Sequence, residues 1–197
     1  RKSWPHKHSG GGEMSIMKGE VFEKVGVNIS TVSGTFEDDF RNQVKGTENS
    51  PEYFATGISL VAHMNSPKIP AFHFNTRFLV TGDSWFGGGA DLTPTLEDKE
   101  SINFFHNQME ESCKNYRENA YKEYKKNCDE YFYLGHRDEP RGAGGIFFDH
   151  VNTDNWNKDF DFIKRVGEST HTAITNIVKN KKDLSWTNEE KDLQLIK

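Results

Sequence analysis

The segment Phe72–Val80 constrains the fold most, because its side chains alternate between large apolar and polar types. One parity holds Phe72, Phe74, Phe78 and Val80, and the other holds His73, Asn75 and Arg77. Successive side chains of a β-strand point to opposite faces, so the pattern predicts a strand with one face on the core. The other face presents an imidazole, an amide and a guanidinium about 6.6 Å apart. Such a row suits the recognition of a large anionic substrate.

The composition predicts one domain that spans residues 1–197 and buries a core of its own. Only 34% of the residues are hydrophobic, yet the chain contains 15 Phe. We therefore expect a core of few residues that is rich in aromatic rings, which also suits a flat planar ligand. The net charge of −5 argues against a general nucleic-acid binder.

The sequence gives no sign of membrane insertion or export. No apolar run reaches about 18 residues, and the start of the chain carries no signal-peptide pattern. Cys113 and Cys128 are too few for a disulfide framework, which indicates a reducing environment. We therefore expect a cytoplasmic protein.

Branched and alternating residues predict further strands around Phe72–Val80. They lie at residues 25–32, 57–63 and 146–149. The proline-bounded turn Asn65–Pro70 predicts that the strand at 57–63 pairs antiparallel with Phe72–Val80, which brings His63 and His73 to the same end. Of the segments without a clear strand pattern, we expect a glycine-broken start at 1–12, a helix or turn at 14–24, and a surface connection with a short helix at 34–50.

After Pro94 the apolar period changes from two residues to three or four, which predicts helices. The first passes through Ile102, Phe105, Met109, Cys113 and Tyr116, with Thr95 and Asp98 as its cap. Later helices are predicted at residues 121–131, 157–180 and 188–196. Neighbouring strands followed by clustered helices indicate the α+β class with an antiparallel sheet.

Two glycine-rich stretches fit no nucleotide-binding motif. Gly87–Gly89 lacks the lysine and threonine of a P-loop, and residues 142–147 place Phe147 where a dinucleotide fingerprint needs its third glycine. We expect Gly87–Gly89 to form a turn that displays Asp91, the sole acid in Trp85–Pro94, and to let the main chain approach a ligand closely. The alternative is two tight turns without a binding role.

Seven segments together resemble the oxygen-dependent coproporphyrinogen III oxidase family. They are residues 10–15, 21–30, 57–63, 71–77, 85–94, 128–137 and 141–149, and they contain the motifs HFNTRF, WFGGGADLTP and RGAGGIFFD. The resemblance implies a large antiparallel sheet with helices on both faces, in a homodimer. It also implies conversion of two propionates of coproporphyrinogen III to vinyl groups in haem biosynthesis, with molecular oxygen consumed and carbon dioxide and hydrogen peroxide released.

The resemblance also assigns roles to particular residues. Substrate propionates are expected to pair with three guanidinium groups, those of Arg77, Arg137 and Arg141. Asp91 is expected to accept pyrrole N–H bonds and to stabilise positive charge as the ring is oxidised. His73 is the expected proton donor, and the expected polar contacts to substrate come from Ser59, Asn75 and Thr76. The alternatives without a role in the reaction are a buried ion pair for Arg77 and Asp91 and a solvated surface charge for Arg137.

A metal is an open question at this point. The family positions proposed as ligands in bacterial members fall on His63, His73, His106 and His136, although the family's chemistry is often described as needing neither a metal nor an organic cofactor. Two rival functions remain, a tetrapyrrole-binding module without turnover and a histidine-ligated metal oxygenase that acts on another acid. The resemblance further implies an N-terminal helical segment and a C-terminal strand and helix that this chain lacks.

Overall fold

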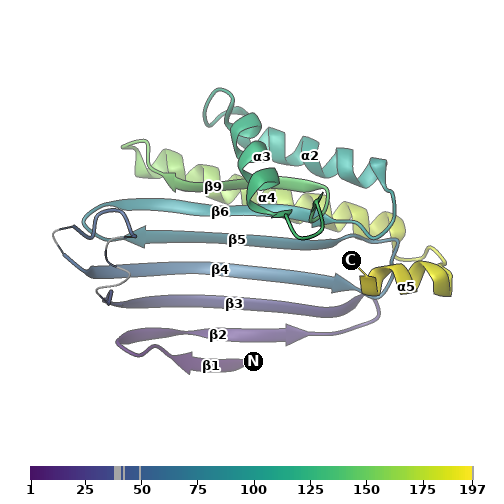
Figure 1. The fold of residues 1–197 in the computed structure, drawn as a ribbon, viewed down its shortest axis with the longest axis horizontal. Coiled ribbons are helices and arrows are strands. Elements are labelled where there is room, and N and C mark those ends of the chain that lie inside the picture. Colours follow the sequence, from purple (N-terminus) through teal and green to yellow (C-terminus); the bar gives the residue numbers. More distant parts are fainter. Residues whose placement is uncertain (38–40, 42, 49, 197) are drawn as a thin grey trace.

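The computed structural model describes residues 1–37, 41, 43–48 and 50–196. Seven strands form one antiparallel sheet in the order β1-β2-β3-β4-β5-β6-β9. Their bounds are β1 Lys2–Pro5, β2 Ser9–Met17, β3 Phe22–Thr35, β4 Glu52–Met64, β5 Ala71–Val80, β6 Ser84–Thr93 and β9 Gly144–Val151. Figure 1 shows these strands side by side with β1 at one edge. The predicted α+β class with a large antiparallel sheet is confirmed.

Four described helices complete the fold. They are α2 Lys99–Lys114, α3 Ala120–Tyr131, α4 Trp156–Lys181 and α5 Asn188–Ile196, and a small hairpin pairs β7 Tyr133–Leu134 with β8 Glu139–Pro140. Helices α2, α3 and α4 lie near β6 and β9, and α5 lies beside the end of β4 (Figure 1). The four predicted helices are therefore confirmed. Asp98 caps α2 by accepting a hydrogen bond from the backbone N–H of Ser101, whereas Thr95 does not serve as the cap. No helix in the described part of the chain is long and apolar enough to cross a membrane.

The core lies between the sheet and the long helix α4. Phe105, Phe148 and Phe162 are fully buried, and the rings of Tyr116 and Phe162 stack with centroids 4.2 Å apart. Each buried Phe contributes about 1.5–3 kcal/mol through the apolar area removed from water. The expected ring-rich core is therefore present, and it fixes the position of β6 and β9 beneath α4.

Strand alternation in β5 follows the predicted parity. Phe72 and Phe74 line a groove against α4, and Phe78 packs on Phe86 and Trp156. We call this side of the sheet the α4 face. The opposite side, which carries Ser59, His73, Asn75 and Arg77, is called the polar face. The C-terminal end of α3 reaches over the polar face, where the Tyr131 ring stacks on Phe147.

Two local predictions are wrong. Residues 14–17 continue β2 rather than starting a helix or turn, because Met14 and Met17 pair with Asn28 and Val25 across the sheet. Gly87–Gly89 lie inside β6 and not in a turn, since all three pair with β5 and Gly88 and Gly89 also pair with β9. Cross-strand pairing outweighs local preference in both places. The short helix predicted within residues 34–50 involves 38–40 and 42, which lie outside the described residues.

Candidate active site

Asp91 is the centre of a polar cluster on the polar face. It lies in β6 opposite His73 of β5 and Gly145 of β9. Its Oδ1 accepts a hydrogen bond from Nδ1 of His73 at 2.9 Å, and its Oδ2 accepts a short one from Nη2 of Arg141. The Asp91 side chain is only 6% exposed. A carboxylate this buried needs hydrogen-bond donors as partners, and His73 and Arg141 supply them.

The contacts of His73 define its tautomer. Because Nδ1–H donates to Asp91, Nε2 is left to accept from Nδ2 of Asn75 at 3.2 Å. Nε2 is therefore the ring nitrogen that faces away from Asp91 and toward Asn75. A histidine that donates to a carboxylate in this way is an arrangement suited to acid–base chemistry. The three side chains form the chain Asp91–His73–Asn75.

Arg141 packs against the Phe132 ring at the end of α3. Its guanidinium carbon lies 3.6 Å from the centroid of the Phe132 ring, a cation–π contact, and Phe132 meets His73 edge-on at 6.2 Å. Arg141 and His73 border a hollow of about 410 Å³ together with Asp91, and His63, Thr93 and Gln194 also line it. Gln194 comes from α5, which is tied to the end of β4 by a bond from its Nε2 to the carbonyl of Met64 at 3.0 Å.

Arg77 lies in a neighbouring hollow and does not border the one lined by His73, Asp91 and Arg141. It borders a polar hollow of about 320 Å³ with Ser59 and Asn75, and its Nη2 donates to Oδ2 of Asp149 at 2.7 Å. The reason is the strand register, because Arg77 pairs with Gly87, four residues along β6 from Asp91, and its counter-charge comes from Asp149 of β9. Asn75 connects the two hollows, because it borders the second and hydrogen-bonds to His73 in the first.

The remaining predicted substrate residues are distributed more widely. Ser59 lies directly opposite Asn75 in the β4–β5 register. Thr76 borders the same hollow, but its position opposite Ile58 gives its side chain the parity of the α4 face. Arg137 lies on the β7–β8 turn, where it pairs with Glu139 at 2.7 Å and donates to the carbonyl of Ile196 at 3.3 Å. It borders neither hollow.

The four histidines proposed as metal ligands do not assemble into one centre. His63 borders the Asp91 hollow with His73, but His136 lies exposed on the β7–β8 turn. Both ring nitrogens of His106 are engaged, by the carbonyl of Ala143 and the hydroxyl of Tyr121, each at 2.9 Å. Among the described residues, no three His, Cys, Asp or Glu side chains gather in a way that could hold a metal. The residues present therefore do not fit the implied four-histidine site.

Replacing His106 with glutamine is expected to flatten the pH dependence of stability. Burial, only partly offset by the hydrogen bond to Ala143, lowers the pKa of His106. In the window below its ordinary pKa of about 6.5, the unfolded chain therefore binds more protons than the folded chain. The free energy of unfolding consequently falls as pH drops through that window. Urea unfolding of wild type and His106→Gln across this window measures the difference, and parallel pH profiles would contradict it.

The two cysteines do not form a disulfide bond with each other. Both are buried and free. Burial raises the pKa of the Cys113 thiol to about 11, and burial together with the nearby Asp91 charge raises that of Cys128 to about 12. Both thiols therefore stay protonated and act as small core residues.

Two neighbours of the candidate site were not predicted from the sequence. Asp149 closes the RGAGGIFFD motif and is the only acid in β9, so alternation along that strand offered a signal for it. No sequence pattern indicated Phe132, because its contact with Arg141 depends on how the end of α3 packs over the sheet.

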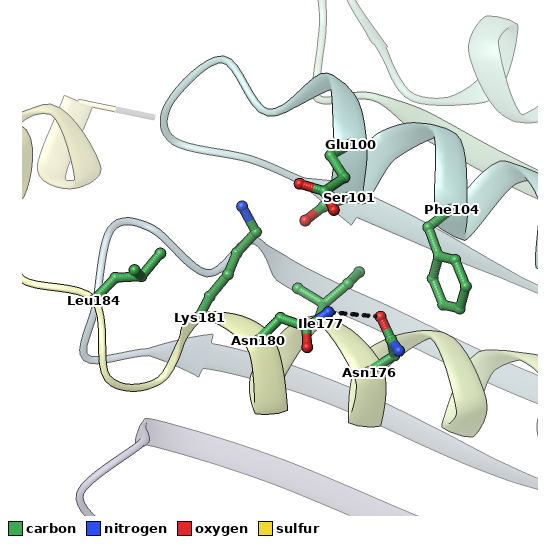
Figure 2. Close-up of a pocket in the computed structure, with 8 residues that line it drawn as sticks. All are labelled: Glu100, Ser101, Phe104, Asn176, Ile177, Asn180, Lys181 and Leu184. Atoms are coloured by element: carbon green, nitrogen blue, oxygen red, sulfur yellow. Dashed lines mark hydrogen bonds between the residues drawn. The ribbon is translucent and has the colours of Figure 1, made fainter.

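Two other hollows lie away from this cluster. A groove of about 550 Å³ runs between α4 and the α4 face and is lined mainly by apolar side chains such as Leu60, Phe74 and Ile174. Figure 2 shows a smaller hollow of about 180 Å³ between the first turns of α2 and the last turns of α4. Beside it Nζ of Lys181 lies 3.0 Å from Oδ2 of Asp98, a pair that ties the two helices together.

A seven-stranded antiparallel sheet with a buried carboxylate and two arginines on its polar face defines a protein suited to a ligand with several carboxylates. The comparisons with known proteins identify the class. The family model described as coproporphyrinogen III oxidase matches residues 1–197. The chain is also 53% identical to the oxygen-dependent coproporphyrinogen-III oxidases of Rickettsia bellii (strain OSU 85-389), Rickettsia africae (strain ESF-5) and Rickettsia akari (strain Hartford). Each alignment covers the whole chain and 71% of the relative. The chain belongs to the coproporphyrinogen III oxidase family.

Proposed function

We propose that this chain catalyses the oxygen-dependent step that its relatives are named for, the conversion of coproporphyrinogen III to protoporphyrinogen IX in haem biosynthesis. Each of two propionates, together with one dioxygen and one proton, becomes a vinyl group, carbon dioxide and hydrogen peroxide. The observation that carries the proposal is the buried Asp91 carboxylate, held between His73 and Arg141 in a hollow on the polar face.

The cluster matches the demands of that chemistry. A pyrrole that gives up electrons to oxygen becomes positively charged, and a buried carboxylate that accepts its N–H stabilises that charge where it develops. Asp91 retains lone pairs beyond the two used by His73 and Arg141. One proton is consumed for each propionate, and Nε2 of His73 is the group positioned to relay it.

Arg141 and Arg77 supply the positive charges that can pair with carboxylates of the substrate. Arg141 borders the hollow of Asp91, and Arg77 lies four residues along β5 from His73, about 13 Å away by strand rise. A large ring placed over Asp91 can therefore present a second propionate to Arg77. Ser59 and Asn75 add polar contacts between the two points.

Arg77→Ala is expected to weaken substrate binding about tenfold and Arg77→Lys less severely. The planar guanidinium can serve Asp149 and a propionate with different N–H groups, whereas lysine offers a single charged point. KM for coproporphyrinogen III measures the effect, with kcat expected to change little. Equal KM values for the two variants would remove the argument for a guanidinium clamp.

An aerobic assay tests the proposed reaction itself. The chain is incubated with coproporphyrinogen III in air and without oxygen, and products are oxidised and followed by porphyrin fluorescence. Oxygen-dependent formation of protoporphyrinogen supports the proposal and excludes a binding module without turnover. Unchanged activity after exhaustive chelation would exclude the histidine-ligated metal oxygenase.

We further propose that the chain works as one domain in a cytoplasmic homodimer, with oxygen as co-substrate and no organic cofactor. The inference for the dimer comes from the family resemblance, and the buried reduced thiols of Cys113 and Cys128 are consistent with a reducing compartment. Light scattering of the purified chain measures the oligomeric state.

A further inference from the structure

We infer that Asp149 is a positioning residue that holds the guanidinium of Arg77 ready for a carboxylate of the substrate, an inference that rests on the proposed function. Oδ2 of Asp149 accepts from Nη2 of Arg77 at 2.7 Å, and the two side chains are 31% and 37% exposed. An arginine at this exposure would sample many rotamers without a partner. The contact selects one of them, so less freedom is lost when a ligand binds.

A β-bulge lies beside the Asp149–Arg77 pair. Phe86 pairs with Val151 and Gly88 with Phe148, so Gly87 alone faces the two residues Asp149 and His150. The extra residue lets Phe148 and Val151 both stay buried while Asp149 takes the polar side. Bulges of this kind re-aim side chains and are frequent beside active sites.

The bulge also contains a residue in an unfavourable conformation. His150 has a φ of 53°, in the left-handed region that a non-glycine residue seldom adopts. Its backbone N–H donates to Oδ1 of Asp149 at 2.9 Å, and its ring stacks on Trp85 with centroids 5.0 Å apart. Both carboxylate oxygens of Asp149 are thus engaged, which fixes the orientation of the carboxylate. Strain of this kind persists where the surroundings enforce it, and it is concentrated at functional sites.

Gly87 provides the space for the ion pair. A Cβ at this position would lie 2.6 Å from Oδ1 of Asp149 and 2.7 Å from Nε of Arg77. The pair therefore lies against the bare backbone of β6. The glycine, the bulge and the left-handed His150 all serve the same contact, which explains why Gly87 belongs in a strand where glycine is otherwise unfavourable.

The contact leaves Arg77 able to bind a ligand. In the part of the chain that the structure describes, only Nη2 of Arg77 has a hydrogen-bond partner. Nη1 and Nε remain available at the polar hollow that Arg77 shares with Ser59 and Asn75. Asp149 therefore orients the guanidinium without occupying all of its donors.

A double-mutant cycle on binding tests this role. The probe is coproporphyrin III, the oxidised aromatic tetracarboxylate, titrated by fluorescence against wild type, Asp149→Ala, Arg77→Ala and the double variant. We expect Asp149→Ala to weaken binding about tenfold in the wild-type background and less than about twofold when Arg77 is already alanine. In turnover, KM should rise by a similar factor while kcat stays within about twofold. Asp154→Ala, which removes the same charge from an exposed position five residues on, is the matched control.

The outcomes separate the alternatives. Equal losses of binding affinity in both backgrounds would indicate a structural role and overturn the inference. Unchanged or tighter binding by Asp149→Ala would also overturn it. Urea unfolding checks that each variant folds. If Asp149→Ala does not fold, Asp149→Asn takes its place. We expect Asp149→Asn to weaken binding about threefold, because one amide oxygen cannot accept from both donors. A wild-type chain that binds coproporphyrin but forms no protoporphyrinogen would overturn the proposed reaction, while the cycle would still decide the role of Asp149.

Discussion

Asp91→Ala is expected to lower kcat by about two to three orders of magnitude, the range seen when a preorganised electrostatic contact to the transition state is removed. The carboxylate carries three tasks at once, since it fixes the tautomer of His73, anchors Arg141 and faces the hollow in which the ring would lie. Alanine removes all three. The measurement is kcat for coproporphyrinogen III under air.

The control for Asp91→Ala is a test of whether the variant still folds. Asp91 lies inside β6, and its loss leaves the charge of Arg141 without its carboxylate partner, although Arg141 is 36% exposed and keeps its contact with Phe132. We therefore expect a cooperative urea transition with only a modest shift. A folded Asp91→Ala variant that keeps more than about half of the wild-type rate would contradict the assigned role.

His73→Ala is the second large effect, with kcat expected to fall about hundredfold, as is typical when a general acid–base group is removed. The reason is that Nε2 is the proton-carrying position in the cluster and Asp91 alone cannot replace it. His73→Gln keeps a polar side chain at the position but cannot carry a proton at neutral pH.

Comparison of the two variants at His73 distinguishes proton transfer from positioning. Both should lose kcat to a similar degree, with the binding of coproporphyrin III changed less than about threefold. Near wild-type turnover in His73→Gln would show that the ring acts only by hydrogen bonding, which would contradict its assignment as the proton relay.

The sequence predicted the strand parity of β5 correctly because one face of that strand is buried. A slip of one residue would have buried the guanidinium of Arg77 and exposed three phenylalanines, so the pattern allowed a single register. The helices were predictable for the same reason, since a three- to four-residue apolar period has no other stable arrangement. Their positions relative to the sheet depend on packing of Phe105, Phe148 and Phe162, which no local pattern encodes.

The failures occurred where tertiary pairing decides the structure. Gly87–Gly89 have a composition typical of a turn, yet they form a strand because all three pair with β5 and Gly88 and Gly89 also pair with β9. Nothing in the residues near Arg77 indicated that its partner would be Asp149, 72 positions away, rather than Asp91. The bulge at Gly87, beside this pair, is a property of two strands together. His106 likewise resembles a possible ligand in sequence, but the fold uses both of its nitrogens for internal hydrogen bonds.

We propose that the tetrapyrrole site is the polar face, and not the larger apolar groove beneath α4. The most direct measurement is an experimental structure of the chain with coproporphyrin III bound. We expect the pyrrole nitrogens within hydrogen-bonding distance of the Asp91 carboxylate, with propionates on Arg141 and Arg77. A ligand seated instead in the groove lined by Leu60, Phe74 and Ile174, with the polar face left empty, would contradict the assignment.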